Sequence, residues 1–256
     1  FCDLKCRYSG LSPDAVVLVA TIRALKMHGG GPRVRPGHNL DEVYTAENLA
    51  LVESGCENLA AHIETVLETG IRPIVCLNGF RTDTSAEVSL VRRIAEAAGA
   101  LFVTSEHWLH GGDGARELAE VVVQGCDEEK SFQPFYSPDL PLSRQIETLA
   151  RKVYGASGVE YSEGAAAKLS RLEKDPSVRE LALCMVKTHL SLSHDPDLKG
   201  RPRGWTLPVR DILEYRGAGF AVPVAGDIKL LPGTGSDPAF RRIDVNVESG
   251  RVTGLF

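Results

Sequence analysis

A short segment with three cationic side chains and a run of glycines is the first place where this 256-residue chain could carry chemistry. It follows an apolar run at residues 15–20, whose length and β-branched content predict a buried strand. The residues concerned are Arg23, Lys26 and His28, followed by Gly29 and Gly30. Cations suit a phosphoryl group or a carboxylate, and glycine lets the backbone approach an anion. The alternative is a short helix and loop with solvated cations, the usual fate of Lys and Arg.

Two aromatic residues, Phe80 and Trp108, each follow a further run with strand character, at residues 71–77 and 101–104. Ligands of parallel sheets bind beyond the carboxyl ends of the strands, so we expect both rings on one rim with the cationic segment. Two rings that converge on a cleft can hold a flat heterocycle by stacking. Each ring alone could equally be an ordinary core residue.

Polar residues beside Phe80 are candidates for contacting a nucleotide base. Asn78 and Asp83 are spaced more widely than in the Asn-Lys-x-Asp base-reading motif. Asp83 or Thr84 could instead begin the next helix, with Glu87 placed to complete a capping box.

Strand and helix signals alternate over residues 14–125 and predict an α/β fold, a parallel sheet with helices on both faces. The predicted helices are 45–69, 84–98 and 114–124. We expect Thr45 to begin the first of these and Gly70 to end it. The Pro- and aromatic-rich stretch 126–143 predicts a boundary. We therefore divide the chain into domains 1–130 and 131–256.

The second half is predicted to be a smaller α+β domain. Its predicted helices are 142–154 and 162–174, and its predicted strands are 181–186, 205–209, 221–224 and 228–231. Two basic segments, 187–194 and 199–204, could form a cationic patch for an acidic ligand tail or could be a solvated basic loop.

Composition excludes several classes of function. The net charge is −5 with both signs interspersed and no basic block, which argues against nucleic-acid binding. No apolar run approaches the ~20 residues of a membrane span. Cys2 and Cys6 could ligate a metal, but no second Cys/His pair has zinc-site spacing, so we expect no metal site and six reduced thiols. A Gly-x-Ser-x-Gly elbow and a Gly-x-Gly-x-x-Gly turn are both absent, which argues against a serine hydrolase and a dinucleotide-dependent dehydrogenase.

Residues 19–30, Val-Ala-Thr-Ile-Arg-Ala-Leu-Lys-Met-His-Gly-Gly, resemble the second signature of the formate–tetrahydrofolate ligase (10-formyltetrahydrofolate synthetase) family. Phe1-Cys-Asp-Leu-Lys-Cys-Arg7 resembles its lead-in, and Gly254-Leu-Phe256 resembles the end of the family's chain. The resemblance covers nearly the whole sequence and identifies it as the C-terminal part of such an enzyme. It implies a P-loop NTPase-like sheet whose P-loop lies upstream, because no Gly-x-x-x-x-Gly-Lys-[Ser/Thr] occurs here.

The resemblance also implies an activity, the ATP-dependent ligation of formate to tetrahydrofolate in one-carbon metabolism. Formyl phosphate would form first, and 10-formyltetrahydrofolate, ADP and phosphate would be the products. Mg2+ would accompany ATP, and a monovalent cation (K+ or NH4+) would activate. We expect formate, tetrahydrofolate and ATP as partners of a homo-oligomer, cytoplasmic or, in a eukaryote, mitochondrial. The fragment alone should be inactive; the alternative is a non-catalytic folate-binding or interaction module.

Site residues follow from the same resemblance. Phe80 and Trp108, with Gly111 and Gly112, would bracket the pterin ring of the folate. Near the nucleotide we expect Asn78, Asp83 and Ser105. Arg23, Lys26 and His28 would act on the phosphoryl intermediate, with Gly29 and Gly30 nearest to it.

Overall fold

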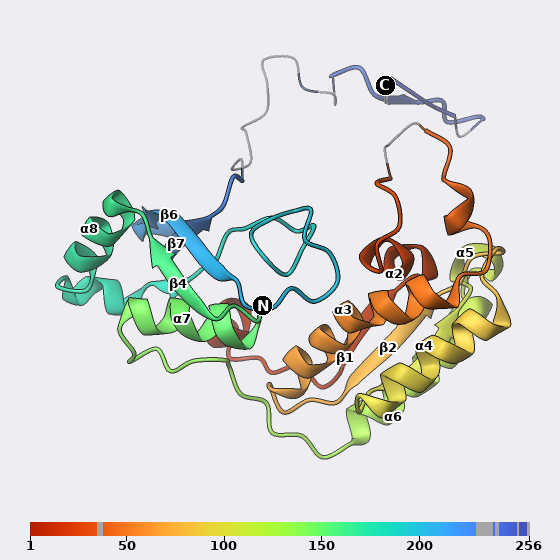
Figure 1. Cartoon of the computed structure of the whole chain (residues 1–256), viewed down its shortest axis with the longest axis horizontal. Helices are drawn as coiled ribbons and strands as arrows, with labels where there is room; N and C mark the ends of the chain where they lie inside the picture. The colour runs from red at the N-terminus through yellow and green to blue at the C-terminus, as the bar shows by residue number, and fades with distance from the viewer. Residues whose placement is uncertain (35–37, 229–237, 239–240, 250, 255–256) are drawn as a thin grey trace.

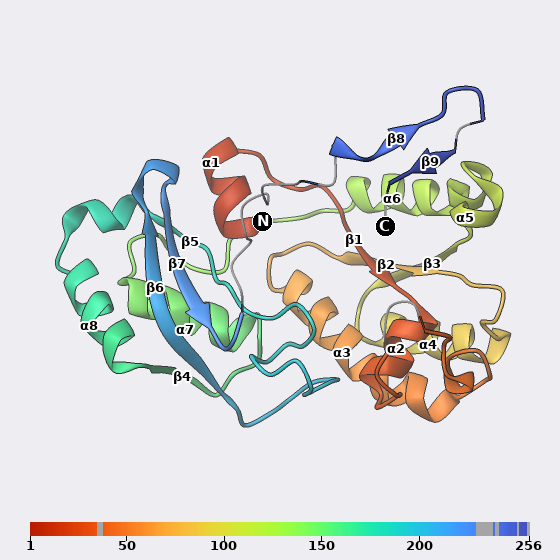
Figure 2. The ribbon, with the colours of Figure 1, turned by 90° about the horizontal axis from the view of Figure 1, so that it is seen from above.

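The computed structural model describes residues 1–34, 38–228, 238, 241–249 and 251–254. They form two lobes that lie side by side, with the N-terminus between them (Figure 1). One lobe is built on a three-stranded sheet and the other on a four-stranded sheet. The two-stranded hairpin β8 (Asp244–Val245) and β9 (Val252–Thr253) lies outside both lobes (Figure 2).

The first sheet is parallel and has the order β1-β2-β3. Its strands are β1 (Val16–Ala20), β2 (Pro73–Asn78) and β3 (Leu101–Ser105). This confirms the predicted parallel α/β sheet. Three parallel strands are common to many α/β folds, so the P-loop NTPase-like arrangement stays a prediction.

Helices cover both faces of this sheet, as predicted. They are α2 (Ile22–His28), α3 (Leu49–Leu67), α4 (Ser85–Ala97) and α6 (Arg116–Asp127). Alternate residues of β2 point to opposite faces. Val75 and Leu77 pack in the cluster formed with α2, α3 and α4, whereas Ile74 and Cys76 pack against α6 on the other face. Figure 2 shows α6 on one side of the sheet and α2, α3 and α4 on the other.

The helix starts show which capping predictions hold. Thr84 caps α4 in a complete capping box with Glu87, as predicted. The prediction for Thr45 is wrong, because α3 begins after Asn48, whose side-chain oxygen accepts from the Leu51 N–H at 3.0 Å. Thr45 instead donates to the Glu42 carbonyl at 3.1 Å and ends a 3-10 turn.

The second lobe holds a mixed sheet in the order β4-β6-β7-β5, in which only β6 and β7 are antiparallel. Its elements are α7 (Leu142–Lys152), β4 (Gly158–Tyr161), α8 (Glu163–Leu172), β5 (Ala182–Leu183), β6 (Thr206–Tyr215) and β7 (Phe220–Ala225). The apolar faces of α7 and α8 pack on this sheet around Ile146, Leu169 and Leu207.

Two strand predictions in this lobe need correction. The predicted strand 181–186 shortens to β5 and a single bridge between Val186 and Val224. Strand β4 was not predicted, because Val159-Glu160-Tyr161 alternates over only three residues after a glycine, which is too short to establish a strand period. The predicted strand 228–231 lies, beyond Ile228, outside the described residues.

The remaining elements are short turns. They are η1 (Cys2–Cys6), α1 (Arg7–Ser9), η2 (Glu42–Tyr44), α5 (His107–His110), η3 (Asp113–Ala115), η4 (Pro176–Glu180) and η5 (Arg216–Ala218). Within the described part of the chain, no helix has the length and hydropathy to cross a bilayer.

The first nine residues pack against the second lobe, although the predicted boundary assigns them to the first domain. The Asp3 carboxylate accepts from the Phe135 N–H at 3.1 Å and from Arg7 at 3.0 Å. Tyr8 donates its hydroxyl to the Gly219 carbonyl at 3.0 Å. The division at residue 130 stays a prediction.

A loop of the second lobe, residues 187–204, docks on α2 and α3. The Gly200 N–H donates to His28 Nδ1 at 3.3 Å, and Asn58 Nδ2 donates to the Gly200 carbonyl at 2.9 Å. Arg201 forms an ion pair with Glu64. These contacts connect the C-terminal end of α2 to the second lobe.

A buried ion pair joins α2 to α4. Lys26 Nζ lies 2.7 Å from Glu87 Oε1, and the two side chains are 1% and 0% exposed. Lys26 also donates to the Ala46 carbonyl, and Glu87 accepts from the backbone N–H groups of Asn48 and Thr84. Burial acts to raise the pKa of Glu87, but these hydrogen bonds outweigh it and lower the pKa. The pair is therefore fully satisfied, as a buried pair must be.

Removing one partner of this pair should strongly destabilise the fold. Lys26→Ala leaves Glu87 buried without its counter-ion, and we expect the free energy of unfolding to fall by about 3–5 kcal/mol. Urea unfolding of the chain measures it. The double variant Lys26→Met/Glu87→Gln removes both charges and should recover part of the loss. A single-variant loss below about 1 kcal/mol, the size of an ordinary surface substitution, would contradict the assignment.

His28 should make stability depend on pH. Burial lowers its pKa, and the charges of Lys199 and His62 act in the same direction. As the pH falls through the unfolded-state pKa of about 6.5, the unfolded chain therefore takes up a proton before the folded chain does. Stability is then full above that pH and is lost below it. We expect the unfolding free energy to drop between pH 7.5 and 5.5.

The matched variant for this measurement is His28→Asn, whose amide oxygen can accept from Gly200 but does not titrate. His62, whose pKa burial also lowers, titrates in both proteins, so the difference between them reports His28 together with its coupling to His62. A smaller drop in the variant supports the assignment, and an identical drop in both proteins contradicts it.

Candidate functional site

The carboxyl ends of β2 and β3 meet at a cavity of about 550 Å³. Its lining residues belong to the segments at and after the carboxyl ends of β1, β2 and β3: Arg23, Asn78, Gly79, Phe80, Arg81, Thr82, His107, Trp108 and Leu109. The volume lies in the range of small-molecule sites. The structure thus brings together four predicted site residues, Arg23, Asn78, Phe80 and Trp108.

Both aromatic rings of this cavity are open to solvent. Phe80 is 38% exposed and Trp108 is 87% exposed. The alternative that they are core residues is therefore excluded. A largely exposed Trp next to a second exposed ring, at the rim of a parallel sheet, is an arrangement that a planar ligand would cover.

A tight turn holds Phe80 at the end of β2. The Phe80 N–H donates to Asp83 Oδ2 at 2.9 Å, and the Asp83 N–H donates back to the Phe80 carbonyl at 3.0 Å. Burial raises the pKa of Asp83, and the charge of Glu87 acts in the same direction. Asp83 therefore supports the turn rather than lining the cavity.

A second turn carries Trp108 on the short helix α5. Ser105 is buried beneath it, with its hydroxyl 3.0 Å from His107 Nδ1 and donating to the Gly114 carbonyl at 3.2 Å. Helix α5 ends at Gly111, whose φ of +57° favours glycine. The predicted residues Ser105 and Gly111, with Gly112, thus shape the loop and are not among the lining residues.

Arg23 lies against the ring of Phe80. Its guanidinium carbon is 4.1 Å from the ring centroid, and its Nη2 makes a long contact of 3.5 Å to Thr82 Oγ1. Three buried polar atoms here, Arg23 Nε, Asn78 Oδ1 and Asp83 Oδ1, have no hydrogen-bond partner in the described structure. The cavity therefore presents two rings, with buried and unpartnered polar atoms beside them.

Four predicted residues lie elsewhere on α2 and the turn that follows it. Lys26 is buried in the ion pair with Glu87, and His28 binds Gly200. Gly29 allows a close approach to α3, since a Cβ there would lie 2.0 Å from the Leu51 carbonyl oxygen. Gly30 has a φ of +110°. Because α2 rises about 1.5 Å per residue, these residues lie progressively farther from the end that carries Arg23. Their roles in catalysis stay predictions.

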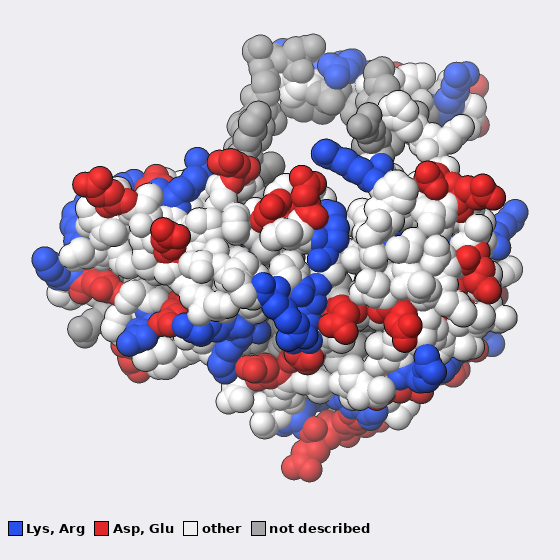
Figure 3. Space-filling view, in the orientation of Figure 1, with Lys and Arg blue, Asp and Glu red and all other residues white. Residues whose placement is uncertain are grey.

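The basic segments of the second lobe form no free cationic patch among the described residues. Lys187 donates to the carbonyls of Thr188, Ser191 and Ser193, and burial lowers its pKa to about 8. Arg201 and Arg203 face Glu64 and Glu57. Figure 3 shows Lys and Arg interleaved with Asp and Glu across the centre of this face. The geometry favours the basic-loop alternative.

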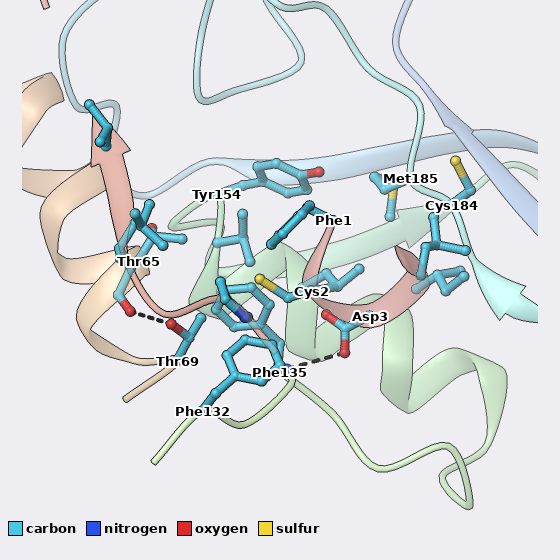
Figure 4. A pocket seen from close by; sticks show the side chains of 18 of the residues that line it. Phe1, Cys2, Asp3, Thr65, Thr69, Phe132, Phe135, Tyr154, Cys184 and Met185 are labelled. Atoms are coloured by element: carbon cyan, nitrogen blue, oxygen red, sulfur yellow. Dashed lines mark hydrogen bonds between the residues drawn. The ribbon is translucent and has the colours of Figure 1, made fainter. Parts of the chain in front are cut away.

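A second cavity, of about 590 Å³, lies between the N-terminal turn and the two lobes (Figure 4). Its walls are mainly apolar and include Phe1, Phe132, Phe135, Tyr154 and Met185. Its polar side chains are used internally: Asp3 binds the Phe135 N–H, and Thr65 and Thr69 donate to helix carbonyls. Because its walls are mainly apolar and offer few polar groups to orient a ligand, it is a weaker candidate than the cavity at Phe80.

No group of three or more His, Cys, Asp or Glu side chains is placed to hold a metal ion in the described ranges. The six cysteines are free thiols, and burial raises the pKa of Cys56 to about 12. Thr82 and His107 also line the cavity at Phe80, and both stand in the segments that the strand pattern predicts on the rim.

Comparisons with known proteins identify the family of this chain. A family model described as formate–tetrahydrofolate ligase matches residues 1–256. Over all 256 residues the chain is 59%, 57% and 56% identical to formate–tetrahydrofolate ligases of Dehalococcoides mccartyi, Desulfotalea psychrophila and Desulfovibrio desulfuricans. It covers 43%, 46% and 43% of those proteins, so it spans under half of their length. The chain belongs to the formate–tetrahydrofolate ligase family.

Proposed function

We propose that the cavity at the ends of β2 and β3 binds the pterin ring of tetrahydrofolate between Phe80 and Trp108. The observation that carries this proposal is the pair of exposed rings lining one cavity of about 550 Å³ at the sheet rim. Stacking needs only flat faces, and it orients a ring while its edge stays free for hydrogen bonds. Asn78 lines the cavity, and its Oδ1, which is buried without a partner, accepts from an N–H group at the edge of the pterin once the side chain turns toward the ligand.

The whole protein then joins formate to tetrahydrofolate. Formate attacks the γ-phosphate of ATP, which gives formyl phosphate and ADP. N10 of tetrahydrofolate attacks the formyl carbon, phosphate leaves, and N10 loses a proton to give 10-formyltetrahydrofolate. In this scheme the residues of this chain bind and orient the folate and keep water from the ring, so that N10 meets the acylating group in a fixed position.

The described residues fit the folate better than they fit ATP with its ion. The chain has no Gly-x-x-x-x-Gly-Lys-[Ser/Thr], and its described residues form no metal-ligand cluster. Mg2+, the monovalent cation and the phosphate cradle therefore belong, in this proposal, to the part of the longer relatives that this chain does not match. Asn78 is the predicted nucleotide residue that reaches the cavity, whereas Asp83 and Ser105 support its turns.

The second candidate is a folate-binding or interaction module without catalysis. It is favoured by the same rings and by the absence of a P-loop motif in this chain. The coding sequence upstream of Phe1 separates the two candidates, because a P-loop in frame there supports the ligase. A cytoplasmic compartment and a homo-oligomer remain part of the ligase proposal.

Trp108→Ala tests the ring site in the intact protein. Loss of one stacked ring should weaken tetrahydrofolate binding by about 1–3 kcal/mol, measured by calorimetric titration. The matched control is Trp205→Phe, which changes a tryptophan that is 8% exposed in the second lobe and whose Nε1 has no partner. It should leave the affinity unchanged. An unchanged affinity in Trp108→Ala would remove this residue from the site.

A further inference from the structure

We propose that Arg23 is a positioning residue of the ring site, which braces one face of Phe80 so that the opposite face receives the ligand. The proposal rests on the proposed function above and deepens it. It assigns Arg23 a different task from the one that the sequence predicts, since its charge is directed at a ring and not at a phosphoryl group.

The contacts of Arg23 fix it against the ring. Its guanidinium carbon lies 4.1 Å from the Phe80 centroid, and its Nη2 reaches Thr82 on the same turn. Its Nε is buried, so this part of the side chain lies within the protein and is not extended into water. Arg23 therefore contacts both the ring and the turn that carries it.

The backbone of Arg23 is equally fixed. It stands in the first turn of α2, which Thr21 caps by accepting from the Ala24 N–H at 3.0 Å. Its helix neighbours Ile22 and Leu25 are 0% and 4% exposed in the core. The guanidinium is thus mounted on a rigid element, as a brace for a side chain on a loop must be.

A cation on one face also changes what the other face of Phe80 attracts. The guanidinium draws the ring's negative quadrupole toward itself. The opposite face then presents less negative charge, which suits an electron-rich heterocycle such as a reduced pterin. With one face of Phe80 covered by Arg23, a ligand ring stacks on the opposite face and does not displace the guanidinium.

The chain offers a matched control for this contact. The Arg92 guanidinium carbon lies 4.6 Å from the Phe102 centroid, on α4 and away from the cavity lining. Arg92→Met therefore removes an equivalent pair of cation and ring elsewhere. Arg23→Met removes the charge but keeps length, and Arg23→Lys keeps the charge but loses the planar fork.

The experiment is calorimetric titration of the intact protein with two probes, tetrahydrofolate and 6-methyltetrahydropterin, which has the ring without the glutamate tail. Arg23→Met should raise both dissociation constants by about threefold to tenfold, which is the effect expected from losing a partly buried cation–π contact. Arg23→Lys should restore part of the affinity, and Arg92→Met should change neither constant. The effect must be equal for the two probes, because Arg23 acts on the ring through Phe80.

Three results would overturn the proposal. A loss for tetrahydrofolate alone would mean that Arg23 binds the tail carboxylate. Tighter binding by Arg23→Met would mean that Arg23 covers the face that the ligand uses. An equal loss in Arg92→Met would mean a general effect on stability.

A ligand-free measurement separates this proposal from the proposed function. In protein labelled with fluorinated phenylalanine, Arg23→Met should shift the resonance of Phe80, assigned with Phe80→Leu, while Arg92→Met leaves it in place. An unmoved resonance overturns the brace whatever the protein binds. Absence of folate binding in the unsubstituted protein overturns the proposed function instead.

Discussion

The buried ion pair of Lys26 and Glu87 connects the helix that carries Arg23 to the helix that follows Phe80. Lys26 belongs to α2 and Glu87 to α4, and the same two groups hold the backbone of Ala46 and Asn48 ahead of α3. Burying two charges costs several kcal/mol for each, so the pair persists only because backbone groups satisfy its remaining bonds. Glu87 also completes the cap of α4, which fixes the turn that carries Phe80. An ion pair outside the cavity thus sets the geometry of its aromatic edge.

Helix α2 divides its residues between two tasks. Its first turn presents Arg23 to Phe80, and its last turn presents His28 to the loop of the second lobe. Two glycines let it pack closely on α3, since a Cβ at Gly29 or Gly55 would lie 2.0 or 1.8 Å from a carbonyl oxygen of the facing helix. This packing lets one short helix hold the ring site and the lobe contact in a fixed relation.

The parts of this architecture that depend on local pattern could be predicted. Apolar runs gave the three parallel strands, and the rule that strand ends share a rim placed Arg23, Asn78, Phe80 and Trp108 together. The start of α3 could not be predicted, because Thr45 and Asn48 are both good caps, and the contact that distinguishes them, from the Asn48 N–H to Glu87, spans 39 residues of the chain.

The different roles of Arg23, Lys26 and His28 could not be predicted from the sequence, because the partners of Lys26 and His28 lie far along the chain.

In this account the cavity at Phe80, and not the larger apolar one at Phe1, receives the folate ring. Hydrogen exchange of the intact protein with and without tetrahydrofolate tests it directly. We predict slower exchange of the backbone amides in residues 79–83 and 106–112, with residues 1–5 and 132–135 unchanged. Protection confined to residues 1–5 and 132–135 would contradict the account.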